Sequence, residues 1–143
     1  MSDVGRADDP LHLLDTDHWQ WTLFPNQCTP GRVQFTLLRR CEGSLAALTE
    51  TEWADLRACL QRFEATSNDL FAPDRFNYKQ LGNQMRQTHV HGIPRYGAPI
   101  NVEGITVRDE RWGDDPFPEP ENPFTHAQVA IIAQKMRSAL TGD

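Results

Sequence analysis

A helix signal in the middle of the chain places the strongest constraint on its fold. Thr49 and Glu52 form a capping box, in which a hydroxyl and a carboxylate bind the free main-chain amides at a helix start. Apolar side chains then recur at helical spacing along one inward-facing stripe: Trp53, Leu56, Leu60 and Phe63. We therefore predict one amphipathic helix from this capping box to about Asn68.

Short segments of alternating apolar and polar residues lie on both sides of this helix. Residues 19–24 and 32–40 precede it, and residues 75–81 and 87–96 follow it. Such alternation is typical of strands, and Pro, Gly and Asn between the segments favour turns. The first two strands are expected to pair antiparallel. The pattern predicts an α+β domain with an antiparallel sheet and a central helix.

The remaining segments complete this outline. A second capping box, from Thr125 to Gln128, predicts a C-terminal helix. Residues 97–123 are rich in Pro, Gly and acidic side chains, which predicts an ordered but irregular surface loop. Residues 1–10 are polar, and we expect a flexible N-terminus there. The loop and last helix, residues 116–143, are expected to pack on the same domain.

Composition limits the classes of function. A chain of 143 residues is the size of one domain. Its net charge of −6 argues against sequence-independent binding of nucleic acid polymers. Cys28, Cys41 and Cys59 are odd in number and widely spaced, so we expect free thiols in a cytoplasmic protein. The sequence contains no apolar run typical of a signal peptide or a membrane span.

Two histidines in the strand predicted over residues 87–96 are the strongest candidates for chemistry. Residues two apart in a strand point to the same face, so His89 and His91 project together, with Gln87 on the same side. The pair can be structural, satisfied by main-chain groups. It can bind zinc, although a catalytic zinc needs a third protein ligand. It can also perform covalent phosphoryl chemistry, in which one imidazole attacks phosphorus and the other stabilises charge.

A wider stretch of sequence resembles a known family. The run GNQMRQTHVHGIPR, residues 82–95, resembles the signature of the histidine-triad family, in which three histidines alternate with apolar residues. Gln87 stands at the first histidine position, His89 at the second and His91 at the third. FPNQCTPGRVQF, SLAALTETEWADL and GITVRDERWG also resemble family segments, the last in a bacterial, diadenosine polyphosphate hydrolase-like branch. The resemblance covers residues 11–115 and implies the histidine-triad fold.

The resemblance implies a nucleotide hydrolase. In the family the second histidine attacks the α-phosphate of dinucleoside polyphosphates or adenylyl conjugates, and water releases a nucleoside monophosphate from the nucleotidyl-histidine. The family's simpler members require no metal in this mechanism, so no metal cofactor is expected here and Mg²⁺ is expected only as part of the nucleotide. The family also implies a homodimer whose two sheets become continuous, and a nucleotide as the partner, with neither nucleic acid nor membrane.

Site residues follow from the same resemblance. Three residues are expected to form the catalytic group. His89 is the nucleophile, His91 binds the phosphate, and Gln87 orients the nucleophile. Substrate binding is assigned to four further residues: Asn26, Asn83, Arg95 and Arg32. For the two asparagines, turn chemistry is an equally simple explanation. Trp112 is either an anchor for its loop or a flat face for a base.

Two departures from the family pattern keep other functions open. Gln87 replaces a histidine, and Arg32 stands where Pro-Gly is usually followed by histidine. The chain is therefore either a hydrolase or a nucleotide-binding protein with weak turnover. A nucleotidyltransferase or phosphorylase would use the same histidine. A metal-dependent hydrolase would combine the two histidines with a downstream carboxylate.

Overall fold

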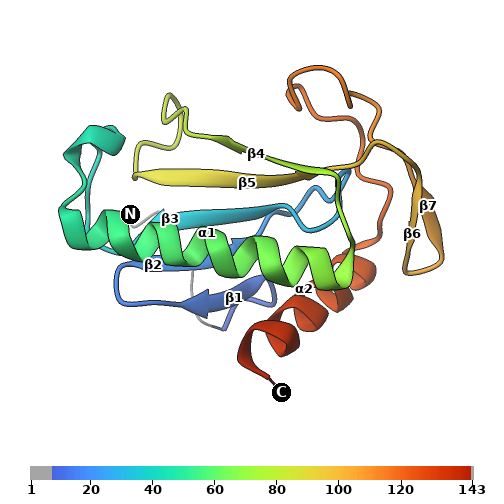
Figure 1. Ribbon diagram of the computed structural model, residues 1–143, viewed down its shortest axis with the longest axis horizontal. Helices are drawn as coiled ribbons and strands as arrows, with labels where there is room; N and C mark the ends of the chain where they lie inside the picture. Colours follow the sequence, from blue (N-terminus) through green and yellow to red (C-terminus); the bar gives the residue numbers. More distant parts are fainter. Residues whose placement is uncertain (1–7, 143) are drawn as a thin grey trace.

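The computed structural model describes residues 8–142 (Figure 1). A five-stranded antiparallel sheet is formed by β1 (His12–Asp15), β2 (Trp19–Leu23), β3 (Val33–Leu37), β4 (Arg75–Lys79) and β5 (His89–Arg95). The remaining elements are a short 3-10 helix (Leu45–Ala47), the long helix α1 (Glu50–Leu70), the hairpin strands β6 (Ile100–Val102) and β7 (Ile105–Val107), and α2 (His126–Thr141). The chain is thus an α+β domain, as the sequence predicts.

The strand order, β1-β2-β3-β5-β4, places the histidine strand inside the sheet. The four predicted strands are all present, and β2 pairs antiparallel with β3 as expected. The sequence analysis did not identify β1, a short edge strand. The proposed flexible N-terminus falls mostly on residues 1–7, which lie outside the described residues. Within residues 8–10, the Asp9 carbonyl accepts a hydrogen bond from the His12 amide at 3.0 Å.

Helix α1 lies across one face of the sheet (Figure 1) and begins with the predicted capping box. Its inward face is not quite the predicted one. Trp53 is 44% exposed, whereas the preceding Glu52 is buried and pairs with Arg39 at 2.8 Å. The placement of Trp53 in the core was therefore wrong. A carboxylate can take an inward position when a guanidinium neutralises it, and simple apolar spacing does not detect this.

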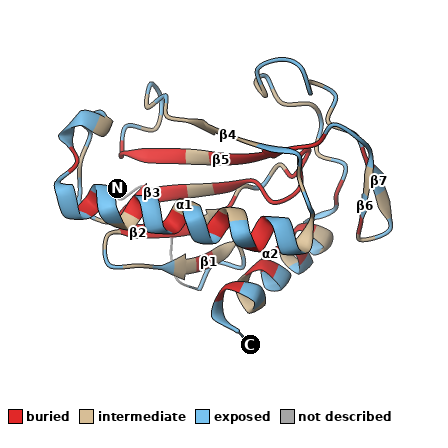
Figure 2. Ribbon diagram, in the orientation of Figure 1, coloured by how far each residue is buried: buried red, intermediate tan, exposed pale blue. Residues whose placement is uncertain are grey.

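The core fills the space between the helices and the sheet (Figure 2). Phe63 of α1 is fully buried at its centre, with ring centroids 5.5 Å from those of both Phe35 and Phe76. Gly92 of β5 faces this ring. A Cβ at Gly92 would lie 2.8 Å from Phe63 and 3.0 Å from Phe35, so the histidine strand approaches α1 more closely than a side chain allows.

Gly92→Ala is expected to lower the free energy of unfolding by about 1–3 kcal/mol, because the Phe63 ring has neighbours on its other sides and cannot move freely. Urea unfolding followed by Trp fluorescence measures this. Gly113→Ala serves as the control, since a Cβ there meets nothing within 4 Å. Equal stability of the two variants would contradict the close-packing argument.

The segment 97–123 contains more regular structure than predicted. β6 and β7 pair as a hairpin, with Glu103 at φ 52° and Gly104 at φ 76° in the two-residue turn. Positive φ at both turn residues matches strand twist, but glutamate is an unusual residue there, so the sequence signal is weak. The prediction of an irregular loop was thus wrong for residues 100–107.

Helix α2 packs beside β1 and starts with the second predicted capping box. Arg62 of α1 donates to the Leu140 carbonyl at 2.8 Å, and Arg137 donates to the His12 carbonyl at 2.6 Å. These contacts hold the C-terminal segment against the sheet domain. Within residues 8–142, neither α-helix combines the length and the apolar character needed to span a bilayer.

Candidate active site

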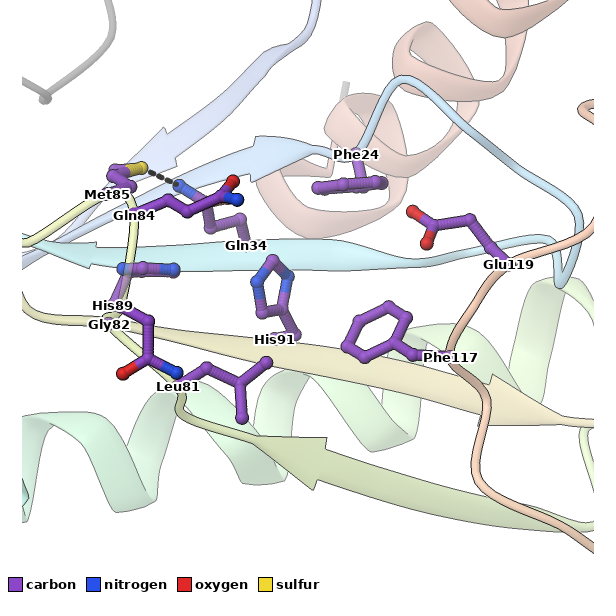
Figure 3. A pocket seen from close by; sticks show the side chains of 11 residues that line it. Phe24, Gln34, Leu81, Gly82, Gln84, Met85, His89, His91, Phe117 and Glu119 are labelled. Atoms are coloured by element: carbon purple, nitrogen blue, oxygen red, sulfur yellow. Dashed lines mark hydrogen bonds between the residues drawn. The ribbon is translucent and has the colours of Figure 1, made fainter.

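His89 and His91 project from the sheet face opposite α1 (Figure 3). Their neighbours Val90 and Gly92 face the core, as strand alternation predicts. On the adjacent strand β3, Thr36 pairs with His89 and Gln34 pairs with His91. The two imidazoles therefore lie on a polar stripe formed by β3 and β5.

An open cavity of about 490 Å³ lies over the two imidazoles. Its walls come from four places: Phe24 after β2, Gln34 of β3, residues 81–85 between β4 and β5, and Phe117 with Glu119 from the loop before α2. In Figure 3, His91 lies between His89 and the Phe117–Glu119 wall. A cavity of this size and shape is typical of small-ligand sites.

The hydrogen bond of His89 defines its tautomer. Its Nδ1 lies 2.7 Å from the main-chain carbonyl oxygen of Gln87. A carbonyl can only accept, so Nδ1 carries a proton, and the lone pair of the neutral ring lies on Nε2. The side chain is 5% exposed and lines the cavity. In its neutral form His89 thus presents the unprotonated Nε2 as its free ring nitrogen, beside the cavity.

His91 is kept neutral by its surroundings. Burial is the main cause that lowers the pKa of His91 to about 4, and electrostatic interactions with His89, whenever that ring is protonated, and with the cations Arg32 and Lys79 add to it. The rings of Phe24 and Phe117 flank it, with centroids 5.3 Å and 5.9 Å away. A neutral imidazole has one N–H to donate, which suits hydrogen bonding to an anionic oxygen without a proton transfer.

The lowered pKa of His91 predicts a pH-dependent stability. Between the usual value of 6.5 and about 4 the unfolded chain binds more protons than the folded one, so stability is full above pH 6.5 and falls as the pH drops toward 4. The loss is expected to reach at most about 3 kcal/mol. Urea unfolding at several pH values measures it. His91→Asn should flatten this slope and the exposed His126→Asn should not; equal slopes in all three proteins would contradict the assignment.

The Gln87 side chain does not have the position that the resemblance implied. Its Nε2 donates to the Leu37 and Arg39 carbonyls at 2.7 and 2.8 Å, and its Oε1 accepts from the Cys41 amide at 3.1 Å. The amide thus ties β5 to the chain after β3. The orienting contact to His89 comes from the Gln87 main chain, which a change of side chain does not remove.

Of the two asparagines proposed to bind substrate, only Asn83 lines the cavity. Asn26 uses its side chain on the protein itself: Nδ2 donates to the Pro120 carbonyl at 2.9 Å, and Oδ1 accepts from the Cys28 amide at 2.9 Å. The turn explanation therefore fits Asn26. Its contact also holds the loop before α2 against the turn after β2.

Arg32 lies behind the cavity wall. Its side chain is 2% exposed, its guanidinium carbon is 4.4 Å from the Phe24 ring centroid and 5.4 Å from that of Phe117, and its Nη2 is 3.7 Å from a Glu119 oxygen. Arg32 itself is not among the described residues that line the open cavity. Arg32 thus acts on the site through its charge and by holding two wall residues.

Arg95 is buried outside the cavity and organises the following loop. Its guanidinium forms a two-armed ion pair with Asp109 at 2.7 and 3.2 Å, and it donates to Asn77 at 2.7 Å and to the carbonyls of Arg111 and Asp114. The substrate-binding assignment of Arg95 is therefore replaced by a structural one. Trp112, in the same loop, packs against Gly97 and is absent from the described cavity lining.

Several lining residues were not singled out from the sequence. Gln34 follows from strand alternation once β3 is known to pair with β5. Phe24, Phe117 and Glu119 reach the site through loop conformations, for which the sequence pattern carries no signal. Among the described residues, no three His, Cys, Asp or Glu side chains gather as a metal-ligand set.

Comparison with known proteins identifies the fold. No protein-family model and no curated protein matches the chain. A histidine-triad protein from Marinobacter aquaeolei VT8 superposes with a TM-score of 0.71 at 21% identity, covering 90% of this chain and 86% of its own. A histidine-triad protein from Sinorhizobium meliloti 1021 gives 0.71 at 19% identity, with 88% and 87% coverage. Plasmodium falciparum diadenosine triphosphate hydrolase gives 0.64 at 16% identity, with 95% and 80% coverage. The chain thus has the histidine-triad fold.

Proposed function

We propose that the protein is a nucleotide hydrolase that acts through a nucleotidyl-histidine intermediate on His89. The observation that carries this proposal is the 2.7 Å contact between His89 Nδ1 and the Gln87 carbonyl, which leaves the Nε2 lone pair available in a cavity. A nitrogen nucleophile needs this protonation state to attack phosphorus. The fold shared with a diadenosine triphosphate hydrolase supports the same reaction class.

The chemistry proceeds in two displacements. The Nε2 lone pair of His89 forms a bond to the α-phosphorus, and the bond from phosphorus to the leaving group breaks with its electron pair going to that group. His91 donates its N–H to a phosphate oxygen as charge develops. Water then attacks phosphorus, the electron pair of the N–P bond returns to Nε2, and one proton passes to solvent. The product is a nucleoside monophosphate.

The proposed substrates are dinucleoside polyphosphates or adenylyl conjugates. The neutral side chains of Gln34 and Asn83 offer hydrogen bonds, while Phe24, Leu81 and Phe117 offer apolar surface for a base or sugar. No metal takes part in these steps, and Mg²⁺ enters only with a polyphosphate. A cytoplasmic homodimer remains part of the proposal from the resemblance, and analytical ultracentrifugation measures the oligomeric state.

The test uses diadenosine tetraphosphate and adenosine 5′-phosphoramidate with EDTA present. We expect release of AMP and, after rapid quenching without acid, a transient mass gain of one adenylyl group on the intact protein. Binding of either compound without product or adduct would instead identify a nucleotide-binding protein. Activity that EDTA abolishes with the phosphoramidate, a substrate that needs no metal, would indicate a metal-dependent hydrolase.

A further inference from the structure

The cavity wall nearest to His91 carries a carboxylate that the two-histidine mechanism does not use. Glu119 lines the cavity from the loop before α2, and its side chain is 29% exposed. The other described lining side chains are the two histidines, neutral amides and apolar groups. Among the described residues that line the cavity, Glu119 therefore supplies the permanent formal charge, which is negative.

Two cations, Arg32 and Lys79, lie near Glu119, but neither is among the described residues that line the cavity. The Nη2 of Arg32 lies 3.7 Å from a Glu119 oxygen, and the buried guanidinium packs against the Phe24 and Phe117 rings and does not line the cavity. Lys79 lies 4.6 Å from the Phe117 ring centroid, and its ammonium group is bound by both oxygens of Asp115, at 2.7 and 2.8 Å. Each cation thus has a carboxylate partner, and a ligand in the cavity meets the Glu119 carboxylate first.

The position of Glu119 relates it to the leaving group. His89 attacks from one end of the cavity, and the leaving group of an in-line displacement departs on the side away from the nucleophile. Glu119 lies at the end away from His89, with His91 between them (Figure 3). The ring contacts agree with this order, since the centroid of the His91 ring lies 5.1 Å from that of His89 and 5.9 Å from that of Phe117.

We propose that Glu119 is a specificity-determining residue that selects nucleotide phosphoramidates, whose leaving group is an amine, over dinucleoside polyphosphates, whose leaving group is a polyanion. This inference rests on the proposed function. The carboxylate accepts a hydrogen bond from the N–H of the leaving nitrogen and repels a leaving nucleoside polyphosphate.

Atoms and charges balance in this selected reaction. The His89 N–P bond forms as the P–N bond to the amine breaks, and the leaving nitrogen keeps the electron pair and takes a proton from solvent. Hydrolysis of the nucleotidyl-histidine returns that proton, because the attacking water loses one. Glu119 stays ionised throughout and changes only its hydrogen-bond partner.

The test compares kcat/KM for adenosine 5′-phosphoramidate and for diadenosine tetraphosphate in the wild type and in Glu119→Gln. The isosteric amide removes the charge and leaves the size and shape of the side chain nearly unchanged. We expect the preference for the phosphoramidate to fall by roughly ten- to hundredfold, mainly through a lower KM for the tetraphosphate. Raising the KCl concentration should favour the tetraphosphate in the wild type only.

Glu121→Gln is the matched control, because it removes the same charge from an exposed position two residues away. It should leave the preference unchanged, and thermal unfolding should show that both variants are folded. An unchanged preference in Glu119→Gln would overturn the role of Glu119 while leaving the hydrolase intact. If the wild type cleaves neither compound and forms no adduct, the proposed function itself fails, and the inference with it.

Discussion

His89→Ala is expected to reduce AMP release by at least about a thousandfold and to abolish the adenylyl adduct. The variant removes the Nε2 lone pair that attacks phosphorus. His91 remains in the cavity, but in the proposed mechanism it only donates a hydrogen bond and does not replace the nucleophile. Both substrates, the phosphoramidate and the tetraphosphate, should be affected equally, because both are attacked by the same nitrogen. Product chromatography and intact-mass spectrometry on the same quenched samples measure the two effects.

The exposed His126→Ala is the control for His89→Ala, since it removes an imidazole that does not line the cavity. It should retain full activity. Nucleotide binding by His89→Ala, measured by calorimetry with AMP, should remain within about tenfold of the wild type, because the cavity walls are unchanged. Residual turnover above a few per cent in His89→Ala would show that the nucleophile is another group or a water molecule.

The paired histidines show what strand periodicity can predict. Alternation alone places His89 and His91 on one face and Val90 with Gly92 on the other, because the side-chain repeat of a strand is fixed at two. Both capping boxes likewise locate helix starts, since they depend on contacts within four residues. The histidine-triad fold was predicted in a different way, from the resemblance of residues 82–95 and of three other segments to that family.

Long-range polar contacts explain what the sequence did not predict. Glu52 is buried because Arg39, thirteen residues earlier, neutralises it, and Trp53 is consequently exposed. Phe117 and Glu119 reach the cavity because Arg95 and Asp109 fix the preceding loop. Such pairings depend on the folded positions of both partners, which no local spacing encodes.

The two departures from the family signature have different physical meanings. At position 87 the change alters a side chain that binds main-chain groups away from His89, while the carbonyl that fixes the His89 tautomer is present in any residue. At position 32 the change introduces a buried charge beside Glu119 and His91. The glutamine is therefore compatible with a nucleophilic His89, and the arginine alters the electrostatics of the leaving-group end.

Arg95→Met should lower the free energy of unfolding by about 3–5 kcal/mol, because it leaves the buried Asp109 carboxylate without its partner. Both side chains of the pair are 3% exposed, so water cannot replace the lost contact. Urea unfolding at pH 7 measures the change. Arg75→Met is the control: Arg75 pairs with Arg95 across β4 and β5 but is exposed, so its effect should stay within about 0.5 kcal/mol.

Loss of the Arg95 pair should also reach the cavity, because a chain of contacts connects them. Arg95 holds the Arg111 carbonyl, Arg111 donates to the Asp115 carbonyl at 2.6 Å, and the Asp115 side chain accepts from the Phe117 amide at 2.8 Å. We expect a higher KM in Arg95→Met under conditions where it remains folded. Adding Asp109→Leu should recover part of the stability, since both charges are then absent. No recovery in the double variant, or a single-variant cost below about 1 kcal/mol, would show that the ion pair does not anchor this loop.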